Sequence, residues 1–492
     1  MMVNPPTMVN GFDPASAASL PERTRAQVER RQRLLGPTYR LFYSTPVEAV
    51  RAEGVYLYDA DGREYLDAYN NVPCVGHCHP RVTAAVAQQM AVLNTNTRYL
   101  QDSILAYSEQ LLATFPDELG NVTYTCTGSE ANDLAMRVAR YHTGSDGIIV
   151  TANAYHGLTS AVAEFSPSLG SGSPLGPHVR AIDAPDELRL PPGQTVADHM
   201  RAQVRAAIAD LARHGFGLRA FIADSIFSSD GVYAHPAGLL RPVVDEVHQA
   251  GGLYIADEVQ PGFGRNGDGW WGFQRHGIVP DIVTVGKPMG NGIPIAAAIF
   301  RPELLTEFGA NIRYFNTFGG NTVSIAAAQA VLDVIGEEHL IENARTVGAY
   351  LRDGLKGLAA GREWIAQVRG AGLFIGMEIT APDGTLTPDG PLAASIVNGL
   401  RERGVLISAS GPHGNVLKIR PPLPFSARDA DRLLEELGRV LDNVRSHLRL
   451  RHWQGDPWPS TSLPRSPEPS TSCWSRSATP SPATRPSPSW NA

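Results

Sequence analysis

Short apolar runs that resemble β-strands alternate with helical patterns through the middle of this 492-residue chain. Helical stretches such as 240–249 separate several of these runs. Strands that alternate with helices favour an α/β domain with a mostly parallel sheet. A ligand site in such a domain is expected beyond the carboxyl ends of its strands. The predicted strands are 122–126, 147–151, 220–224, 253–257, 281–285 and 295–300.

Lys287 and Asp257 stand at the ends of two of these predicted strands. Lys287 follows the run 281–285 and precedes a glycine-rich turn. A lysine enclosed at such a position has a lowered pKa and supplies a nucleophilic amine that can form an imine. Asp257 ends the run 253–257 and suits the pyridinium nitrogen of a bound cofactor. Together the two residues predict pyridoxal phosphate (PLP) chemistry.

The segment 126–133 (Cys-Thr-Gly-Ser-Glu-Ala-Asn-Asp) follows a predicted strand and opens a helix that Gly144 is expected to end. We expect Ser129 to cap this helix. The backbone N–H groups of 128–130, together with the helix dipole, would then bind an anion such as phosphate. An ordinary capped helix is the commoner meaning of such a motif standing alone. Its place in one domain with the predicted lysine and aspartate favours the phosphate site.

Three further segments offer contacts to a flat, phosphorylated cofactor. Tyr155 and His156 follow the strand 147–151, where the tyrosine would stack on a ring and the histidine would line the pocket; a core aromatic is the alternative. Gln260 is placed to donate to the cofactor's phenolic oxygen, with a surface glutamine as the alternative. The run 315–321 (Phe-Asn-Thr-Phe-Gly-Gly-Asn) offers a hydroxyl and backbone donors for a phosphate.

Composition argues against several other classes of protein. The formal net charge is −7 and 18% of the residues are charged, so we expect neither a nucleic acid nor a membrane surface as partner. The first 20 residues lack the apolar core of a signal peptide, and apolar runs such as 293–300 are too short to cross a bilayer. Four cysteines in a chain of this length do not form a disulfide framework, so we expect a cytoplasmic location.

The segment 76–80 (Gly-His-Cys-His-Pro) suggests a metal site, to which Cys74 would add a further soft ligand. No second ligand cluster of matching spacing follows, and Pro80 indicates a turn into a helix. We therefore expect no metal. The signatures of serine hydrolases and of P-loop proteins are absent from the sequence.

The chain divides into five predicted parts. Residues 1–40 form an N-terminal arm, and residues 41–75 begin a small domain that 331–450 completes. Residues 76–330 form the large PLP-binding domain. The Pro- and Ser-rich residues 451–492 are expected to be disordered. The smaller predicted elements are a helix at 21–35, a hairpin turn at 59–62, a helix at 324–335, a short strand within 372–378 and a helix at 427–441.

As a set, these motifs resemble the class III aminotransferases, which are PLP enzymes of fold type I. The resemblance covers about residues 45–441. It implies an α/β large domain with a mostly parallel, seven-stranded-type sheet and a smaller α+β domain. The matching motifs are 76–80, 127–131, 155–157, 256–260, 286–287 and 317–321.

The resemblance also implies catalytic roles for two residues. Lys287 would hold PLP and later shuttle the proton on the substrate's Cα. Asp257 would keep the pyridine nitrogen protonated, which makes the ring an electron sink. Tyr155 would stack on the ring, and Gln260 would contact its 3-oxygen.

The phosphate of PLP would be bound by residues from two chains. Gly128 and Ser129 would cradle it from one subunit, and His156 would line the same pocket. Thr317 would complete the cradle from the neighbouring subunit, so the resemblance implies a homodimer with shared active sites.

Within the class, several stretches resemble the branch that contains ethanolamine-phosphate and phosphohydroxylysine phospho-lyases. Two departures from the ordinary class pattern matter. Lys418 stands where many members have an arginine for the substrate carboxylate, and Ser229 stands where they have a glutamate that pairs with it. Lysine is a point charge and binds a carboxylate less well than the planar arginine fork. The candidate anion contacts are Arg98, Lys418 and Arg420; a surface or structural charge is the alternative for each.

Three hypotheses follow from these residues. Transamination, in which an amine or amino acid gives its amino group to a 2-oxo acid, is favoured because it is the commonest outcome of this scaffold. A phospho-lyase that eliminates phosphate from a substrate such as O-phosphoethanolamine is the alternative, and racemisation is a smaller one. The third hypothesis is a regulator without catalysis, which the presence of Lys287, Asp257 and Gln260 argues against.

Overall fold

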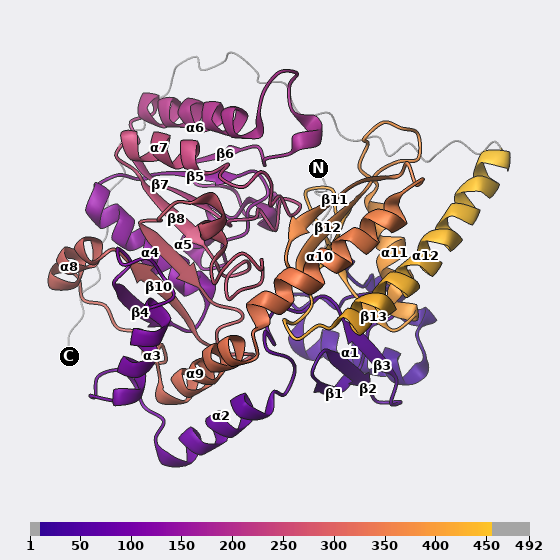
Figure 1. Ribbon diagram of the computed structural model, residues 1–492, viewed down its shortest axis with the longest axis horizontal. Coiled ribbons are helices and arrows are strands. Elements are labelled where there is room, and N and C mark those ends of the chain that lie inside the picture. The colour runs from indigo at the N-terminus through magenta and orange to yellow at the C-terminus, as the bar shows by residue number, and fades with distance from the viewer. Residues whose placement is uncertain (1–9, 455–492) are drawn as a thin grey trace, which may run out of the picture. The chain divides into compact units, whose positions relative to one another are not determined.

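The computed structural model describes residues 10–454, of which 10–444 form one compact unit (Figure 1). The disordered tail predicted at 451–492 lies, from 455 onward, outside the described residues.

A seven-stranded sheet in the order β4-β10-β9-β8-β7-β5-β6 carries the site. Strand β10 runs antiparallel to β4 and β9, and the other neighbours pair in parallel. Strands β5, β7, β8, β9 and β10 are buried along their whole length, which is typical of a sheet covered on both faces. The strands are β4 (Asn121–Thr125), β5 (Gly147–Thr151), β6 (Val179–Ile182), β7 (Leu218–Ala223), β8 (Leu253–Asp257), β9 (Ile282–Val285) and β10 (Ala296–Phe300).

The six strands predicted from the sequence are confirmed to within two residues at each end, and the mostly parallel α/β sheet is confirmed with them. Strand β6 was missed. It is a four-residue edge strand in which Arg180 is half-buried and Ala181 is exposed. It therefore lacks the apolar run by which the buried strands were found.

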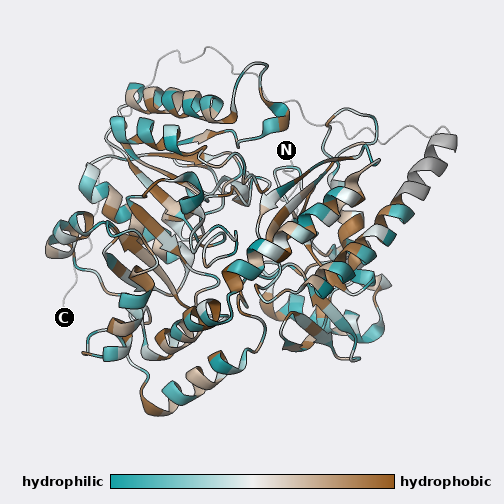
Figure 2. Ribbon diagram, in the orientation of Figure 1, coloured by the Kyte–Doolittle hydropathy of each residue, from teal (hydrophilic) through white to brown (hydrophobic). Residues whose placement is uncertain are grey.

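Helices cover the sheet and bury its apolar side chains. Helix α4 (Gly128–Thr143) packs on β9 and β10, whereas α6 (Val196–Arg213) and α7 (Arg241–Gln249) pack on each other and on β6, β7 and β8 (Figure 1). The strands of the sheet are largely hydrophobic in Figure 2. The core between α4 and the sheet includes Leu134, Val138, Ile148, Ile222 and Ile255. Each large apolar side chain buried in this way contributes roughly 1.5–3 kcal/mol to the free energy of unfolding.

Two four-stranded sheets lie outside the central sheet, in the orders β1-β2-β3-β13 and β11-β12-β15-β14. Strand β13 joins residues from 331–450 to those of 41–75 by pairing with β3. That pairing agrees with the predicted small domain, whose boundaries at 76 and 331 stay a prediction. These strands are β1 (Ala49–Glu53), β2 (Tyr56–Asp59), β3 (Glu64–Asp67), β11 (Ile365–Ala371), β12 (Phe374–Ile379), β13 (Val405–Leu406), β14 (Ser408–Ser410) and β15 (Val416–Ile419).

The predicted helices and the hairpin are also present. Helix α1 spans Glu22–Leu35 and is followed by Gly36, and β2 and β3 form the hairpin around 59–62. The other α-helices are α2 (Pro80–Val92), α3 (Asp102–Leu112), α5 (Ser160–Ala163), α8 (Pro302–Asn311), α9 (Thr322–Glu337), α10 (Leu340–Ala359), α11 (Gly390–Glu402) and α12 (Ala427–Gln454). Short 3-10 helices are Pro14–Ser19, Pro167–Leu169, Glu187–Arg189 and Gly272–His276.

The described part of the chain has neither a membrane-spanning helix nor a cluster of metal ligands. None of its helices combines the length and apolar character needed to cross a bilayer. Across residues 10–454, no group of three or more His, Cys, Asp or Glu side chains is placed to hold a metal ion. In the motif 76–80, His77 instead pairs with Asp67 at 2.7 Å and His79 with Glu338 at 3.3 Å.

Candidate active site

A cavity of about 430 Å³ opens at the carboxyl ends of the central strands. Asp257 is the last residue of β8, and Lys287 lies two residues beyond the end of β9. Both line the cavity, as do Tyr155, His156 and Gln260. The parallel pairing of β8 with β9 therefore brings together the two residues that the sequence predicted to carry the chemistry.

Three hydrogen-bond donors fix the carboxylate of Asp257, which is only 4% exposed. Its Oδ2 accepts from Nδ2 of Asn132 at 3.0 Å and lies 2.7 Å from Nδ1 of His156. Its Oδ1 accepts from the backbone N–H of Val259 at 3.1 Å. The carboxylate is thus held rigidly at the wall of the cavity.

The amine of Lys287 has a lowered pKa, about 8. Burial is the main cause, and the positive charge of Arg420 adds to it, whereas Asp257 acts in the opposite direction. The Nζ atom lies 5.9 Å from the centre of the Tyr155 ring. A larger fraction of this lysine is uncharged near neutral pH than of an ordinary one, which makes it a nucleophile.

The N-terminus of α4 forms one wall of the cavity, but the residue that caps it is not the predicted one. The N-cap is Thr127, whose side chain accepts from the N–H of Glu130, while Glu130 bonds back to the N–H of Thr127. The prediction of Ser129 as the cap was wrong, because the helix begins at Gly128 and places Ser129 in its first turn. The Oγ atom of Ser129 instead accepts from the N–H of Leu158 at 3.2 Å.

Two glycines, Gly128 and Gly157, lie so close to neighbouring atoms at this helix end that a larger residue would not fit. A Cβ added at Gly128 would lie 2.9 Å from a methyl group of Val259. A Cβ added at Gly157, whose φ is +141°, would collide with Ser129. The first-turn N–H groups of a helix have no acceptor within the helix, so those of Gly128 and Ser129 are free to bind an anion.

Two of the candidate anion contacts, Lys418 and Arg420, are buried beside Gln260. Lys418 lies in β15 and is 8% exposed, and Arg420 is 4% exposed, so neither is a surface charge. The Oε1 atom of Gln260 accepts from Nη1 of Arg420 and lies 3.4 Å from Nζ of Lys418. This orientation leaves the amide N–H₂ of Gln260 as a donor.

Neither of these cations forms an ion pair with a carboxylate of the described residues. Burial and the charge of Arg420 lower the pKa of Lys418 well below its usual value. The acid that acts most directly on Lys418 is Asp224, a cavity residue whose own pKa is raised by burial. Asp224 is occupied by donors of its own, the N–H of Ile226 and the N–H and hydroxyl of Ser228.

Arg98 and Thr317 are exposed and do not line the cavity of their own chain. The guanidinium carbon of Arg98 lies 3.8 Å from the centre of the Phe315 ring. A single chain therefore does not bring these two candidates to the site, and their predicted roles remain predictions.

Two residues at the site were missed in the sequence. Asn132 bonds to Asp257, to the carbonyl of His156 and, through Oδ1, to the hydroxyl of Thr284 at 2.7 Å. Asp230 accepts from Thr151 Oγ1 at 2.7 Å and from the N–H that begins the turn carrying Tyr155. The available signal for Asn132 was a polar residue among the apolar ones of the α4 core face.

The cavity fits PLP on the chemistry of its lining. It offers an amine of lowered pKa, a fixed carboxylate and an aromatic ring at the end of one sheet. The N-terminus of α4 offers free N–H groups for a phosphate, with the room that Gly128 leaves. These four features are what a phosphorylated pyridine aldehyde requires of a protein.

The family model and the similar proteins point to one family. The model of the family "Aminotransferase class-III" matches residues 42–441. An alanine–glyoxylate aminotransferase 2-like protein of Drosophila melanogaster is 40% identical over 420 residues, which are 83% of this chain and 85% of that one. Ethanolamine-phosphate phospho-lyase homolog 1 of Caenorhabditis elegans is 37% identical over 461 residues, which are 88% of this chain and 98% of that one.

Solved structures give the same result. A phospholyase from Arthrobacter in complex with phosphoethanolamine superposes with a TM-score of 0.81 at 45% identity, covering 85% of this chain and 99% of that one. A Bacillus anthracis aminotransferase superposes with a TM-score of 0.78 at 26% identity, covering 86% and 99%. The chain belongs to the class III aminotransferases, a family of PLP-dependent enzymes of fold type I.

Proposed function

We propose that this chain is a PLP-dependent phospho-lyase that acts on a small amine carrying a phosphate ester, such as O-phosphoethanolamine. The observation that carries the proposal is the buried pair Lys418 and Arg420, which has no carboxylate partner of its own among the described residues. Burial disfavours the charged form of both side chains and lowers the pKa of each. A substrate phosphate brings two negative charges and offsets that effect for both cations.

The residue at position 229 supports an anion other than a simple α-carboxylate. Ser229 is half-buried, and its carbonyl oxygen accepts from Nδ2 of Asn153 at 2.7 Å and from the N–H of Gly411 at 3.2 Å. A glutamate at this position would pair with a nearby cation, as the resemblance implies for many members of the class. With serine there, the charges of Lys418 and Arg420 stay available to the substrate.

The chain's own groups account for the proton transfer. PLP, when bound, supplies an electron sink for the carbon next to the amine. Lys287, with a pKa of about 8, takes the proton from that carbon. With PLP in the cavity, Asp257 would lie against the ring nitrogen, Tyr155 would pack on the ring, and Gln260 would donate its N–H₂ to the ring oxygen.

The elimination balances without an amino acceptor. The C–H bond next to the amine breaks: its proton goes to Nζ of Lys287, and its electron pair forms a C=C bond to the carbon that carries the phosphate. The C–O bond to phosphate breaks, and its electron pair leaves on the phosphate, where Lys418 and Arg420 stabilise the charge. Water then converts the remaining fragment to an aldehyde and ammonia.

Two relatives support this choice. The Arthrobacter structure is that of a phospholyase with phosphoethanolamine, and it shares 45% of its sequence with this chain over 99% of its own length. The Caenorhabditis elegans relative is named for the same reaction. The sequence alone favoured transamination; the burial of Lys418 and Arg420 now favours elimination.

Transamination is the second candidate, in which a 2-oxo acid takes up the amino group of an amine or amino acid. The observation in its favour is that the carboxylate of an oxo acid also fits two unpaired buried cations. The Drosophila melanogaster relative carries the name of such an enzyme. Both reactions need Lys287 and Asp257, so the products have to be measured.

The proposal includes a homodimer. Large apolar side chains are exposed where helix α2 ends, in the loops that carry Arg98 and Thr317, and in the turn after β5; they include Val92, Tyr99, Leu100, Phe318 and Leu158. Exposed large apolar side chains suit an interface with a second protein chain. A second copy that covers these side chains would bring its Thr317 and Arg98 to the cavity.

A cytoplasmic location is also part of the proposal, since Cys74, Cys78 and Cys126 are free thiols.

A product assay on the PLP-loaded protein tests the reaction. With O-phosphoethanolamine and no oxo acid, the proposal predicts release of inorganic phosphate and ammonia in equal amounts. The variant that tests the role of the cation is Lys418→Met, which keeps roughly the length of the side chain and removes its amine. Phosphate release should then fall at least about 10-fold, as expected for the loss of one charge-assisted hydrogen bond. Formation of a new amino acid that depends on pyruvate or 2-oxoglutarate, without phosphate release, would establish transamination instead.

A further inference from the structure

The loop 68–76 joins strand β3 to helix α2 and lies beside the candidate active site. Its residue Val72 lines the active-site cavity. The start of the loop is bonded to Arg420: the carbonyl of Ala68 accepts from its backbone N–H at 2.7 Å, and the carbonyl of Tyr69 accepts from its Nε at 3.2 Å. The loop therefore connects the cavity with one of the two cations proposed to bind the substrate phosphate.

The end of the same loop is held in place by two further segments. Asn291, in the glycine-rich turn after β9, accepts from the N–H of Val75 at 3.1 Å and donates to the carbonyl of Gly76 at 2.9 Å. The N–H of Leu423 donates to the carbonyl of Cys74 at 2.8 Å. Because both ends of the loop are bonded to the walls of the site, the residues between them have a fixed place there.

Asn71 is one of these residues and lies between Tyr69, which contacts the cation, and Val72, which lines the cavity. Its side chain is only 1% exposed, and its Nδ2 atom has no hydrogen-bond partner among the described residues. The neighbouring Asn70 differs, because its Oδ1 accepts from the N–H of Val72 at 3.1 Å and so serves the turn itself. A buried donor without an acceptor is unfavourable, so a bound molecule is expected to supply one.

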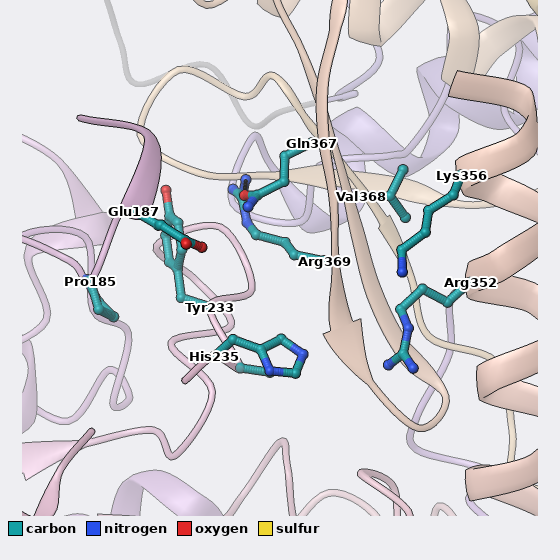
Figure 3. Close-up of a pocket in the computed structure, with 10 residues that line it drawn as sticks. Pro185, Glu187, Tyr233, His235, Arg352, Lys356, Gln367, Val368 and Arg369 are labelled. Carbon is teal, nitrogen blue, oxygen red and sulfur yellow. Dashed lines mark hydrogen bonds between the residues drawn. The ribbon is translucent and has the colours of Figure 1, made fainter. Parts of the chain in front are cut away.

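Arg369 shows that an unpartnered buried donor does not by itself indicate a ligand site. Its Nη2 atom also lacks a partner within the described chain. Its guanidinium, however, is paired with Glu378 and lies 4.2 Å from the centre of the Tyr233 ring. Figure 3 shows this arginine leaving strand β11 on the face opposite to helix α10, away from the other cations around that cavity. Asn71 differs because its loop contacts both the active-site cavity and Arg420.

We propose that Asn71 binds the phosphate of the substrate by donating a hydrogen bond from Nδ2, next to Arg420. This role rests on the proposed function, in which the substrate carries a phosphate ester. A phosphate has three strong acceptor oxygens, so it accepts from the amide without giving up Lys418 or Arg420. The phosphate of PLP is assigned to the N-terminus of α4, so the cofactor does not need this donor.

Binding of 3-aminopropylphosphonate to the PLP-loaded full-length protein tests the contact. This amine has a CH₂ group where O-phosphoethanolamine has its ester oxygen, so it offers the same charge and cannot release phosphate. Asn71→Leu removes the donor at similar size and should weaken binding at least about 10-fold. Butylamine lacks the phosphonate and should bind the variant and the wild type equally. Both dissociation constants are measured from the absorbance change of the bound cofactor.

A second variant and a matched control separate this contact from a general loss of stability. Asn71→Asp keeps the shape of the side chain and should weaken phosphonate binding more than Asn71→Leu, because the two negative charges repel. The control is Asn266→Leu. Asn266 is also buried with an unpartnered amide among the described residues, but it lies between β8 and β9 and not in the loop beside Arg420. This control should bind the phosphonate like the wild type.

The role of Asn71 is overturned if the wild type does not bind the phosphonate or if Asn71→Leu binds it unchanged. It is also overturned if Asn71→Leu loses butylamine as strongly as the phosphonate, or if Asn266→Leu loses the phosphonate equally. The proposed function fails in a different measurement, the release of phosphate from O-phosphoethanolamine. Phosphonate binding that depends on Asn71, without such release, would contradict the phospho-lyase and support the contact.

Discussion

Nδ1 of His156 lies 2.7 Å from Oδ2 of Asp257, and both side chains are buried. The same oxygen accepts from Asn132, and Asn132 accepts in turn from Thr284. Helix α4, the turn after β5 and the strands β8 and β9 are therefore tied to one carboxylate. That carboxylate is the group we propose to lie against the ring nitrogen of PLP.

Removing the link through Asn132 should weaken PLP binding. In Asn132→Ala, Asp257 loses a donor and Thr284 loses its acceptor, so we expect the dissociation constant of PLP to rise about 10-fold. The measurement is absorbance titration of the apoprotein with PLP. Arg140→Ala, on the exposed side of the same helix, is the control and should bind PLP like the wild type. An unchanged dissociation constant in Asn132→Ala would contradict the role given to this bond network.

Asp230 should position the turn that carries Tyr155. It bonds to Thr151 and to the N–H of Asn153, and Asn153 bonds in turn to the carbonyl of Ser229. Asp230→Ala should raise the dissociation constant of PLP about 10-fold, whereas Asp230→Asn keeps an acceptor and should lose less. The dissociation constant is measured by absorbance titration with PLP. The position of the visible absorbance band of the bound cofactor is recorded as well, because a general loss of stability would not shift it.

The pH dependence of stability checks the environment of Asp230. Burial raises the pKa of its carboxyl to about 6, against an ordinary value of 3.8. Between these values the folded chain binds more protons than the unfolded chain, so the contribution of Asp230 to stability falls as pH rises from about 4 to about 6. Urea unfolding should show a smaller loss over this interval in Asp230→Asn than in the wild type, and equal losses would contradict the raised pKa.

Lys287 should make the stability of the apoprotein depend on pH in the opposite sense. Its pKa is about 8 in the folded chain and 10.5 as an ordinary lysine, so between these values the unfolded chain binds more protons. Stability therefore rises with pH across this interval. Lys287→Met lacks the group, and its stability advantage over the wild type at about pH 8 should shrink by about pH 10. A difference that stays constant in urea unfolding would mean that burial does not disfavour the charged amine.

Lys287 and Asp257 could be predicted from the sequence because the signal for each lies within a few neighbouring residues. A buried strand, a reactive residue at its end and a glycine-rich turn are all visible in a short window around Lys287, and the same holds for Asp257. The parallel sheet then brings the two windows together. The class of fold followed from the alternation of elements, which does not depend on any single residue.

What the sequence could not supply were contacts between distant segments. The burial of Lys418 and Arg420 depends on β15 packing beside Gln260, 158 and 160 residues away. The choice of Thr127 over Ser129 as the helix cap depends on where the backbone leaves its extended conformation, which shifts by one or two residues without changing the pattern. Thr317 and Arg98 are exposed and do not line the cavity of their own chain, so a contact with the site would need a second chain.

Substrate choice should respond to positions 418 and 229 together. Ser229→Glu with Lys418→Arg supplies an arginine and a carboxylate that pairs with it, as in relatives that use α-amino acids. Phosphate release from O-phosphoethanolamine should fall at least about 10-fold, because the paired arginine no longer offers its charge to the phosphate. Lys418→Arg alone keeps the unpaired charge and is the control. Equal activity of the double variant and the control would show that Ser229 has no part in selecting the substrate.

The most direct test of the account is to find which lysine binds PLP. The chain contains only three lysines, Lys287, Lys356 and Lys418, and the charge of Lys287 contributes to the lowered pKa of Lys418. Borohydride reduction of the PLP-loaded protein followed by peptide mass spectrometry fixes the cofactor to the residue that holds it. The account predicts the added mass on the peptide that contains Lys287 and its absence in Lys287→Ala. Modification of Lys418 or Lys356 instead, with Lys287 unmodified, would contradict it.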